Sequence, residues 1–395
     1  MNSRRMPLGQ ALEALIDHRG KTPKKLGGDW SADGHRVVSA LNIKNNTVDG
    51  NEHHFISEEL YEKWMKVKLR AGDVLLTSEA PTGEAAYLAE DYNWALGQRV
   101  FGLRGKKGLL DGRFLFYALR GGALRHDLMS RTTGTTVQGI RQSELVKVEI
   151  DLPELDEQRA IAATLGALDD KIESNRRLAE RASALIDASA SQLLARTSTE
   201  VLPLADLVEF NRLSVNPHST DALRYIDIAS VSPGQIDSVQ ELTWNEAPSR
   251  ARRGVSDGDV IYSTVRPGNR AFALIVDPTP GSVASTGFAV MSPSVRLGSS
   301  MLTSVVGALE FAEYLESVAH GSAYPAVGIQ AMGNYSVVVP KEAVVAEQFE
   351  ADTMPLRRRV AQARAESERL AALRDTLLPE LLSGRMRVPV EEAAA

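Results

Sequence analysis

The chain has 395 residues, a formal net charge of −6 and no cysteine. Its length favours two to three domains, each able to bury a core without covalent staples. The lack of cysteine excludes disulfides, zinc ribbons and thiol nucleophiles and suits a reducing compartment. No apolar run approaches the ~20 residues of a membrane span, so we expect a cytoplasmic protein without a membrane partner.

The charge is distributed unevenly along the chain. Residues 1–153 carry 22 Lys and Arg against 19 Asp and Glu, a net +3, whereas residues 201–340 carry 8 against 13, a net −5. Most nucleic-acid binders are basic. Any DNA contact must therefore depend on local basic patches or on basic partners.

The first elements along the chain predict a mixed α+β unit. Its start is predicted to be helical because apolar residues recur at helical spacing, at Leu8, Leu12, Leu15 and Ile16. Short β-type runs bounded by Gly, Asp and Pro follow at 37–43 and 74–77. A helical segment at 113–129, a glycine-rich loop and a strand at 146–152 complete the unit.

A long, uninterrupted helical pattern then runs from Pro153 to residue 196. Pro153 precedes an acidic first turn, which suits a helix start. Spacings of three and four residues alternate in a heptad seam, formed by Ile161, Leu165, Leu168, Ile172, Asn175 and Ile186.

The same order of elements returns at an offset of about 186 to 190 residues. Gly-Asp-Val at 72–74 matches 258–260, and Gly-Ile at 139–140 matches 328–329. A period this long indicates a duplicated domain rather than a solenoid, whose units are roughly 20–50 residues. A duplicated domain suggests a two-part target, or two copies of one partner.

The second unit repeats the first with small changes. Its start is again predicted to be helical, with Leu204, Leu207 and Val208 at the required spacing. Strands are predicted at 225–231, 260–264, 271–276 and 335–339, and a helical segment at 301–318. The second glycine-rich loop carries a proline and is expected to be longer than the first.

A second heptad seam follows the second unit, at Leu356, Val360, Leu370 and Leu377. Two narrow, matching seams rich in Ala and Ser favour pairing of the two helices, with Asn175 and Ser367 helping to fix the register. The alternative is that each helix packs separately on its own globular unit.

Several of these segments resemble conserved regions of type I restriction-modification specificity subunits. The resemblance is carried by Leu-Pro-Glu-Leu-Asp-Glu-Gln-Arg-Ala-Ile at 152–161 and by Leu-Leu-Pro-Glu-Leu-Leu-Ser-Gly-Arg at 377–385. The loop Thr-Gly-Thr-Thr-Val-Gln-Gly-Ile at 133–140 and the opening Arg-Gly-Lys-Thr-Pro at 19–23 are also typical. These motifs cover almost the whole chain in the family's order.

The resemblance implies an α+β fold with two similar target recognition domains, separated by two long helices that form an antiparallel coiled coil. Each domain would read one half of a bipartite, interrupted double-stranded DNA site. The helices would bind two copies of a DNA adenine methyltransferase subunit, and a restriction subunit can join. The chain would hold no cofactor, with S-adenosylmethionine expected in the methyltransferase, and ATP and magnesium in the restriction subunit.

On this basis the domain limits are predicted as follows. Residues 1–153 and 199–340 form the recognition domains, and residues 154–198 and 341–388 form the helices that space them and dock the methyltransferase. Residues 389–395 are expected to be a disordered tail.

The candidate DNA-contacting residues have side chains that can bond to base edges or to phosphates. Arg and Lys read guanine and Asn and Gln read adenine, whereas Ser, Thr, Lys and Arg contact phosphates. In the first unit the candidates are Lys21, Thr22, Lys25, Lys44, Asn45, Thr77, Ser78, Thr82, Thr133, Thr135, Gln138 and Arg141. In the second unit they are Arg250, Arg252, Arg253, Thr264, Arg266, Asn269, Arg270, Tyr324 and Gln330.

Arg266, Asn269 and Arg270 are the strongest candidates, because the Pro-Gly pair at 267–268 would present them stiffly and exposed. The alternative is an ordinary turn with solvated charges. Lys21, Thr22 and Lys25 are expected to position phosphates.

Motifs that carry catalysis are missing from the sequence. It contains no phosphate-cradling Gly-x(4)-Gly-Lys-Ser/Thr run and no Asn-Pro-Pro-Tyr-like methyltransferase motif. The pair His53-His54 lacks partner ligands at useful spacing, and Asp169-Asp170 and Glu58-Glu59 are expected on solvated helix faces. A non-catalytic DNA-recognition subunit is therefore predicted. The alternative is an adaptor for protein or glycan, with two modules on a coiled-coil spacer.

Overall fold

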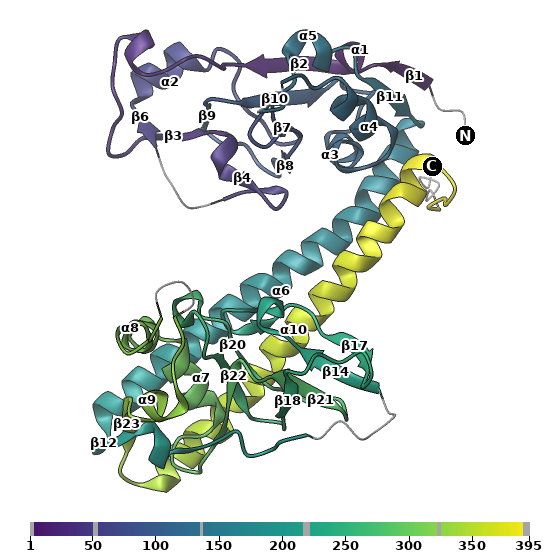
Figure 1. Cartoon of the computed structure of the whole chain (residues 1–395). Helices are drawn as coiled ribbons and strands as arrows, with labels where there is room; N and C mark the ends of the chain where they lie inside the picture. The colour runs from purple at the N-terminus through teal and green to yellow at the C-terminus, as the bar shows by residue number, and fades with distance from the viewer. Residues whose placement is uncertain (1–3, 50–53, 135–136, 216–221, 322–324, 390–395) are drawn as a thin grey trace, which may run out of the picture. The chain divides into compact units, whose positions relative to one another are not determined.

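A computed structural model describes residues 4–49, 54–134, 137–215, 222–321 and 325–389. It divides into two compact units (Figure 1), unit 1 with residues 1–172 and 368–395, and unit 2 with residues 173–367. Each unit contains a stretch of both long helices, α6 (Leu155–Arg196) and α10 (Ala343–Ser383).

Unit 1 is built on an antiparallel four-stranded sheet in the order β2-β10-β7-β8. These strands are β2 (Leu12–Asp17), β10 (Val100–Gly105), β7 (Val74–Thr77) and β8 (Ala85–Tyr87). A second sheet has the order β6-β3-β9, with β6 (Phe55–Ile56), β3 (His35–Val38) and β9 (Ala95–Leu96). The pairs β4 (Ile43–Lys44) with β5 (Thr47–Val48) and β1 (Arg4–Pro7) with β11 (Glu149–Leu152) complete the strands.

Unit 2 repeats this topology except for one element of the second sheet. Its main sheet has the order β13-β22-β19-β20, with β13 (Val208–Phe210), β22 (Phe288–Pro293), β19 (Val260–Ser263) and β20 (Phe272–Leu274). The hairpin β15 (Val231–Ser232) with β16 (Gln235–Ile236) and the pair β12 (Thr199–Pro203) with β23 (Ser336–Pro340) also have counterparts in unit 1. In both units the second sheet contains one parallel pair, β3 with β9 and β14 with β21. The duplication in the sequence is therefore a duplication of fold.

The second sheets differ in one element. Unit 1 has helix α2 (Glu58–Trp64) beside a three-stranded sheet, and this helix buries Leu60, Tyr61 and Trp64. Unit 2 has a fourth strand instead, in the order β17-β14-β21-β18, with β17 (Gln240–Thr243), β14 (Ala222–Ile226), β21 (Ser282–Ser285) and β18 (Ala251–Gly254).

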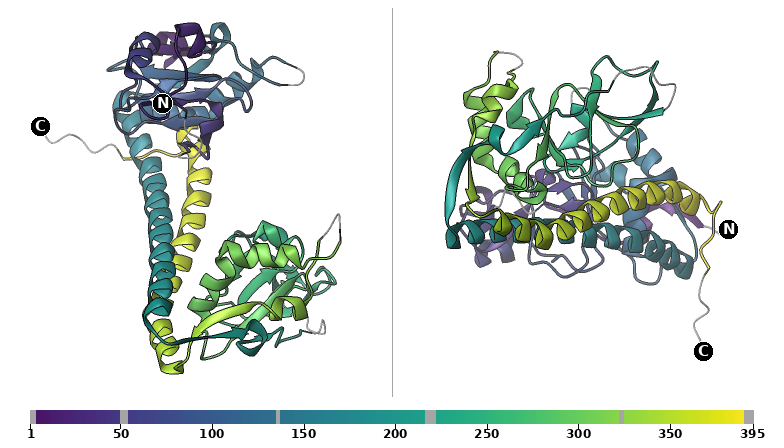
Figure 2. Two further views of the ribbon diagram at one scale, coloured as in Figure 1. Left: turned by 90° about the vertical axis from the view of Figure 1, so that its left-hand side faces the viewer. Right: turned by 90° about the horizontal axis from the view of Figure 1, so that it is seen from below.

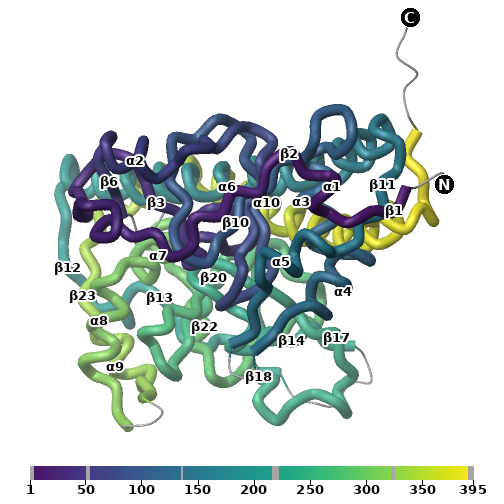
Figure 3. Tube along the Cα trace, turned by 90° about the horizontal axis from the view of Figure 1, so that it is seen from above, coloured from purple at the N-terminus to yellow at the C-terminus, as the bar shows by residue number. Residues whose placement is uncertain are grey.

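The predicted helices at the start of each unit are wrong. Only one helical turn forms in unit 1, α1 (Leu8–Ala11), and the chain continues from it directly into strand β2, as Figure 3 shows. In unit 2 the matching residues are the 3-10 turn η3 (Leu204–Asp206) and strand β13. Leu8, Leu204 and Leu207 are buried, and Leu12 and Leu15 are half-buried. Strands β2 and β13 nevertheless pair with β10 and β22, and this sheet pairing overrides local spacing.

Each helical segment in the middle of a unit is two helices. In unit 1 the helices are α3 (Gly112–Arg120) and α4 (Gly122–Ser130), separated at Gly121, which adopts an extended conformation. In unit 2 they are α7 (Ser299–Gly307) and α8 (Leu309–Ser317), separated at extended Ala308. The short helices α5 (Gln142–Leu145) and α9 (Ile329–Gly333) follow the glycine-rich loops.

The two long helices pair antiparallel within each unit (Figure 2). In unit 2 the Asn175 side-chain amide donates to Glu366 at 2.9 Å, while Asp187, further along α6, meets Arg357, further back along α10. In unit 1 Asp169 meets Arg374 at 2.7 Å. The fold class is thus the predicted one, α+β with two similar units and a pair of antiparallel helices.

The seam residues face inward. All ten are buried or half-buried: Ile161, Leu165, Leu168, Ile172, Asn175, Ile186, Leu356, Val360, Leu370 and Leu377. The register contact differs from the expected one, because Asn175 bonds to Glu366, whereas the Ser367 hydroxyl donates to Ala363 of its own helix.

Candidate nucleic-acid interface

Two of the predicted loops in unit 1 meet at one junction. Glu79, in the loop after β7, forms a β-bridge with Gly139 of the glycine-rich loop, and Gly139 also bridges Thr133. The Ile140 N–H donates to the Ser78 carbonyl at 2.8 Å, and the Thr82 hydroxyl donates to the Gln138 carbonyl at 2.6 Å. We name this contact the loop junction of unit 1.

Gly139 lies where the two backbones approach closely, so a side chain at this position would fit only tightly. A Cβ at this position would lie 3.1 Å from the Glu79 Cβ and 3.2 Å from the Ser78 carbonyl oxygen. The glycine in the family-like motif therefore joins the two loops.

Unit 2 has the same loop junction. Val265 and His320 each bridge Ala326. The Val327 N–H donates to the Thr264 carbonyl at 2.8 Å, and the Arg266 N–H donates to the Pro325 carbonyl at 2.7 Å. In both units the loop after β7 or β19 thus packs against the loop before α5 or α9.

The alignment of Gly139-Ile140 with Gly328-Ile329 is wrong by two residues. The bridges match Gly139 with Ala326 and Ile140 with Val327. The bridged residues Thr133 and Gly139 are six positions apart, and so are His320 and Ala326, so the second loop is not the longer one. Gln330 consequently lies on helix α9 and is not the counterpart of Gln138.

The β4–β5 hairpin is the third predicted region, and it packs on β8 as the β15–β16 hairpin packs on β20. Asn45 and Asn46 both have positive φ, 52° and 64°, which fits a two-residue turn of type I′. Lys44 lies beside them, with its amine 3.6 Å from the Asp49 carboxylate. Asn45 and Lys44 are exposed, as base or phosphate contact requires.

Thr77, Ser78 and Thr264 are not available as predicted. Thr77 and Ser78 are buried, and the Thr77 hydroxyl accepts from the Glu84 N–H at 2.9 Å. The Thr264 hydroxyl donates to the Gly287 carbonyl at 2.9 Å. These side chains hold the loops in place.

A cavity of about 320 Å³ in unit 1 borders the loop junction. Its lining includes Lys21, Thr22, Trp30, His54, Ala80 and Arg99. Lys21 is turned inward, since its amine donates to the Trp64 carbonyl at 2.8 Å, and burial together with the charge of Lys66 lowers its pKa. Lys25 is exposed, with its amine donating to the Gly20 carbonyl, and is the better placed of the two lysines for a phosphate.

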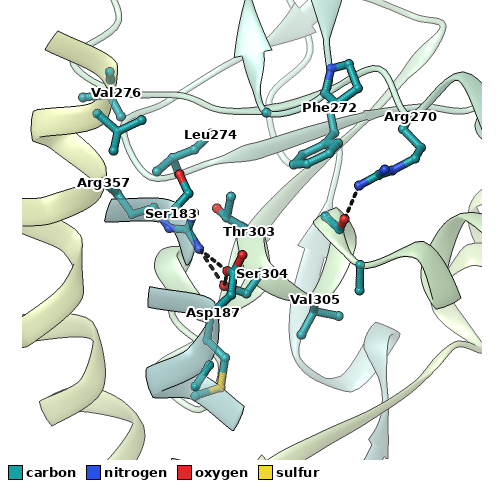
Figure 4. Close-up of a pocket in the computed structure, with 18 of the residues that line it drawn as sticks. Ser183, Asp187, Arg270, Phe272, Leu274, Val276, Thr303, Ser304, Val305 and Arg357 are labelled. Atoms are coloured by element: carbon teal, nitrogen blue, oxygen red, sulfur yellow. Dashed lines mark hydrogen bonds and ion pairs between the residues drawn. The ribbon is translucent and has the colours of Figure 1, made fainter. Parts of the chain in front are cut away.

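Arg266 and Asn269 are exposed, whereas Arg270 is not presented as predicted. Arg266 has a left-handed backbone with φ 49° before Pro267. Arg270 turns back into unit 2, where its guanidinium donates to the Gly307 carbonyl and borders a cavity of about 550 Å³ (Figure 4). Because the Arg270 side chain is half-buried and bonds to the Gly307 carbonyl, the exposed presentation expected for Arg270 is wrong.

The remaining candidates are dispersed. Thr133, Gln138, Arg141, Arg250 and Gln330 are exposed. Arg252 and Arg253 are half-buried, and the Arg252 guanidinium donates to the Ala251 carbonyl at 2.7 Å. Thr135 and Tyr324 lie outside the described residues.

Arg99 was missed by the sequence reasoning. It lies in the turn before β10, has φ 64° and is half-exposed, and its guanidinium pairs with Glu79 of the loop junction at 3.0 Å. Trp30 and His54 also border the cavity, with ring centroids 4.9 Å apart. In the sequence, Gln98-Arg99 of the first unit stands where the second unit has Thr286-Gly287. An arginine in place of a turn glycine is the feature that could have pointed to Arg99.

Among the described residues, no group of His, Cys, Asp or Glu side chains could hold a metal ion. None of the helices that the structure describes is both long and apolar enough to cross a membrane.

Known proteins are similar to this chain in sequence and fold. Residues 5–182 match the family model of the type I restriction modification DNA specificity domain. The MjaVIII specificity subunit of Methanocaldococcus jannaschii is 31% identical over 132 residues, which cover 32% of this chain and 31% of that protein. The MjaIX specificity subunit of the same organism is 24% identical over 346 residues, covering 80% and 78%.

A solved structure extends the likeness to the whole fold. The specificity subunit of a type I restriction-modification system from M. genitalium superposes with a TM-score of 0.64 at 18% identity, covering 96% of each chain. Residues 5–182 thus resemble the type I restriction modification DNA specificity domain, and the repeated α+β units share the fold of a type I restriction-modification specificity subunit.

Proposed function

We propose that this chain recognises a two-part DNA sequence for a type I restriction-modification complex and performs no catalysis itself. One observation carries the proposal: both units have the same loop junction but differ in the side chains around it. Shared scaffolds with different exposed polar groups suit the reading of two different half-sites, because base edges are distinguished by donor and acceptor patterns.

In this proposal residues 1–153 and 199–340 are the two recognition domains. Residues 154–198 and 341–388 dock two methyltransferase subunits, to which a restriction subunit can be added. S-adenosylmethionine, ATP and magnesium then belong to those partners, and double-stranded DNA is the ligand of this chain.

The acidic balance of residues 201–340 favours a second candidate, an adaptor for protein or glycan. The two candidates separate by co-expression with an N6-adenine methyltransferase subunit encoded beside this chain. We expect a complex with two methyltransferase subunits per specificity subunit and DNA affinity that falls steeply as salt rises. Failure to bind any such methyltransferase would favour the adaptor.

Arg266 tests the reading of one half-site. Since this exposed arginine stands at the unit 2 junction, Arg266→Ala should relax one half-site and leave the other unchanged, as measured by sequencing the methylated motifs. Lys25→Ala should weaken binding to all sequences and lower the salt slope by about 1. Arg212→Ala removes the same charge from an exposed position of unit 2 that is not among the candidate contacts and serves as the control. An unchanged motif set in Arg266→Ala would contradict the assignment of this loop.

A further inference from the structure

Each loop junction has two positions from which an arginine could project, and their correspondence follows from the backbone contacts. The bridges match Glu79 with Val265. The next residues, Ala80 and Arg266, have the same left-handed φ of 49° and both precede a proline. Ala80 of unit 1 thus occupies the position of Arg266.

The second position lies in the turn before the strand β10 or β22. In unit 1 the Arg99 carbonyl accepts from the Ser78 N–H at 2.8 Å, and in unit 2 the Gly287 carbonyl accepts from the Thr264 N–H at 2.8 Å. Gly287 therefore occupies the position of Arg99. Each junction therefore has one arginine at these two positions. In unit 2 it is Arg266, at the first position, and in unit 1 it is Arg99, at the second.

Arg99 occupies a backbone conformation that disfavours its side chain. A left-handed φ costs a non-glycine residue roughly 1–2 kcal/mol, and such outliers gather at functional sites. The turn itself does not require an arginine, since unit 2 has a glycine there. A role for the side chain explains why the unfavourable residue is present.

The surroundings of Arg99 fit contact with a ligand. The guanidinium is about half-exposed, at 49%, and it is held at the junction by Glu79, itself 43% exposed. It borders the unit 1 cavity together with Lys21 and Thr22. Because Glu79 is itself partly exposed, it orients the Arg99 guanidinium while leaving that guanidinium accessible to solvent and to a ligand.

We propose that Arg99 determines specificity in the half-site contacted by unit 1, by reading a guanine as Arg266 does from the other position in unit 2. Arg can bond to guanine O6 and N7 together, which gives discrimination against the wrong base. Glu79 is a positioning residue that sets the direction of the Arg99 fork. This inference rests on the proposed DNA recognition and names one of its determinants.

The test uses the complete complex with its methyltransferase and two variants. Arg99→Gly removes the side chain and, because glycine adopts a left-handed φ freely, also the cost of this backbone conformation, so the melting temperature should stay level or rise. Arg99→Lys keeps the charge but loses the planar fork. For both we expect affinity for the wild-type site to fall roughly 10- to 100-fold, with one G position becoming degenerate in one half of the methylated motif and the other half intact.

The outcomes separate the two levels of the proposal. If the wild-type complex methylates a two-part motif and Arg99→Gly, still folded, methylates the same motif, the role of Arg99 is refuted while DNA recognition stands. If Arg99→Lys methylates the wild-type motif, the proposed two-bond contact of the guanidinium with guanine is refuted, because a positive charge alone is then sufficient. A wild-type complex that methylates no specific motif would overturn the proposed function. Glu79→Gln tests the positioning role. If Glu79 sets the direction of the Arg99 fork, this variant should also make the G position degenerate, whereas a pair that only stabilises the loop would leave that position unchanged.

Discussion

In each unit one helix, α3 in unit 1 and α7 in unit 2, contacts the long helices. The contacting side chains are large in unit 1 and small in unit 2. Aligned from their first residues, α3 and α7 place Arg113, Tyr117 and Arg120 where unit 2 has Ser300, Ser304 and Gly307. In unit 1 the three large side chains reach α6, where Tyr117 donates to Asp169 at 2.7 Å and Arg120 lies 3.0 Å from it. In unit 2, Ser304 and Gly307 line the cavity of about 550 Å³ shown in Figure 4, and the Ser300 hydroxyl accepts from Arg357, which also lines it.

The electrostatics differ accordingly. In unit 1, Asp169 accepts from Tyr117, Arg120 and Arg374 together. Burial alone would raise the pKa of Asp169, but the hydrogen bonds from Arg374 and Tyr117 outweigh it and hold this pKa below its usual value. In unit 2 burial lowers the pKa of Arg357, whose main carboxylate partner, Asp187, is largely exposed.

The comparison shows that one backbone arrangement tolerates two kinds of packing. Unit 1 fixes α3 to the helices through one carboxylate shared by three donors. Unit 2 relies on hydroxyls and a single arginine, because the Arg357 guanidinium donates to the Ser304 hydroxyl at 2.6 Å and to the Ser300 carbonyl. The following changes test whether this difference is one of stability.

The largest effect is expected from Asp169→Ala. It leaves the half-buried cations Arg120 and Arg374 without their shared carboxylate, which costs about 3–5 kcal/mol when a buried pair loses one partner. Hydrogen exchange at the amides of α3 should accelerate by roughly two to four orders of magnitude. Asp170→Ala is the control, because Asp170 is 67% exposed and pairs only with Arg113 among the contacts described for it, so its loss should cost less than about 1 kcal/mol. Equal exchange in both variants would contradict the special role of Asp169.

Acid should affect the two units differently. Asp169 has a lowered folded pKa, so its stabilisation is present above the unfolded pKa and is lost as the pH falls through the folded value. Glu350 accepts from the Ser300 N–H at the start of α7, and burial raises its pKa, so its contribution is favourable at low pH and is lost as the pH rises through the folded pKa.

We therefore expect exchange at α3 to accelerate before exchange at α7 as the pH is lowered below about 4, near the unperturbed range of carboxylates. Exchange rates are corrected for their intrinsic pH dependence with the unfolded chain. Earlier opening of α7 would reverse the comparison.

The smallest effect is expected from Arg357→Met. Arg357→Met removes the buried member of an ion pair whose other member, Asp187, is 57% exposed and stays solvated, and the lowered pKa of Arg357 shows that burial works against this charge. The free energy of unfolding should change by less than about 1 kcal/mol, measured by denaturant unfolding of the whole chain. Arg364→Met, which removes a second arginine bordering the same cavity, gives a matched measurement. A loss as large as that of Asp169→Ala would show that unit 2 also depends on its buried charge.

The sequence predicted those parts of the structure that leave a periodic trace. The duplicated order of elements, the two long helices and their inward seams follow from spacings of two, three and four residues. The first apolar stretch was misread because Leu12, Leu15 and Ile16 have a spacing that fits a helix, whereas pairing with β10 decides the conformation. Such pairing depends on residues about 90 positions away, which local spacing does not contain.

The candidate site was predictable only as a set of loops. Their convergence rests on bridges such as Glu79 with Gly139, and counting glycines gave the wrong partner in unit 2. The backbone conformation of Arg99 and the inward turn of Arg270 have no sequence signature. Asp169 was assigned to a solvated face because its partners Tyr117, Arg120 and Arg374 come from distant parts of the chain.

The membership of residues 368–389 in unit 1 affects how the protein is made. Leu378 and Leu381 belong to the same apolar core as Leu8, Phe101 and Phe114. During synthesis the first unit therefore lacks part of its core until residues 368–389 have been translated, although unit 2 has all its residues earlier. A chain that stops early exposes apolar surface in its oldest part, which marks incomplete products for chaperones and proteases before they can join a complex.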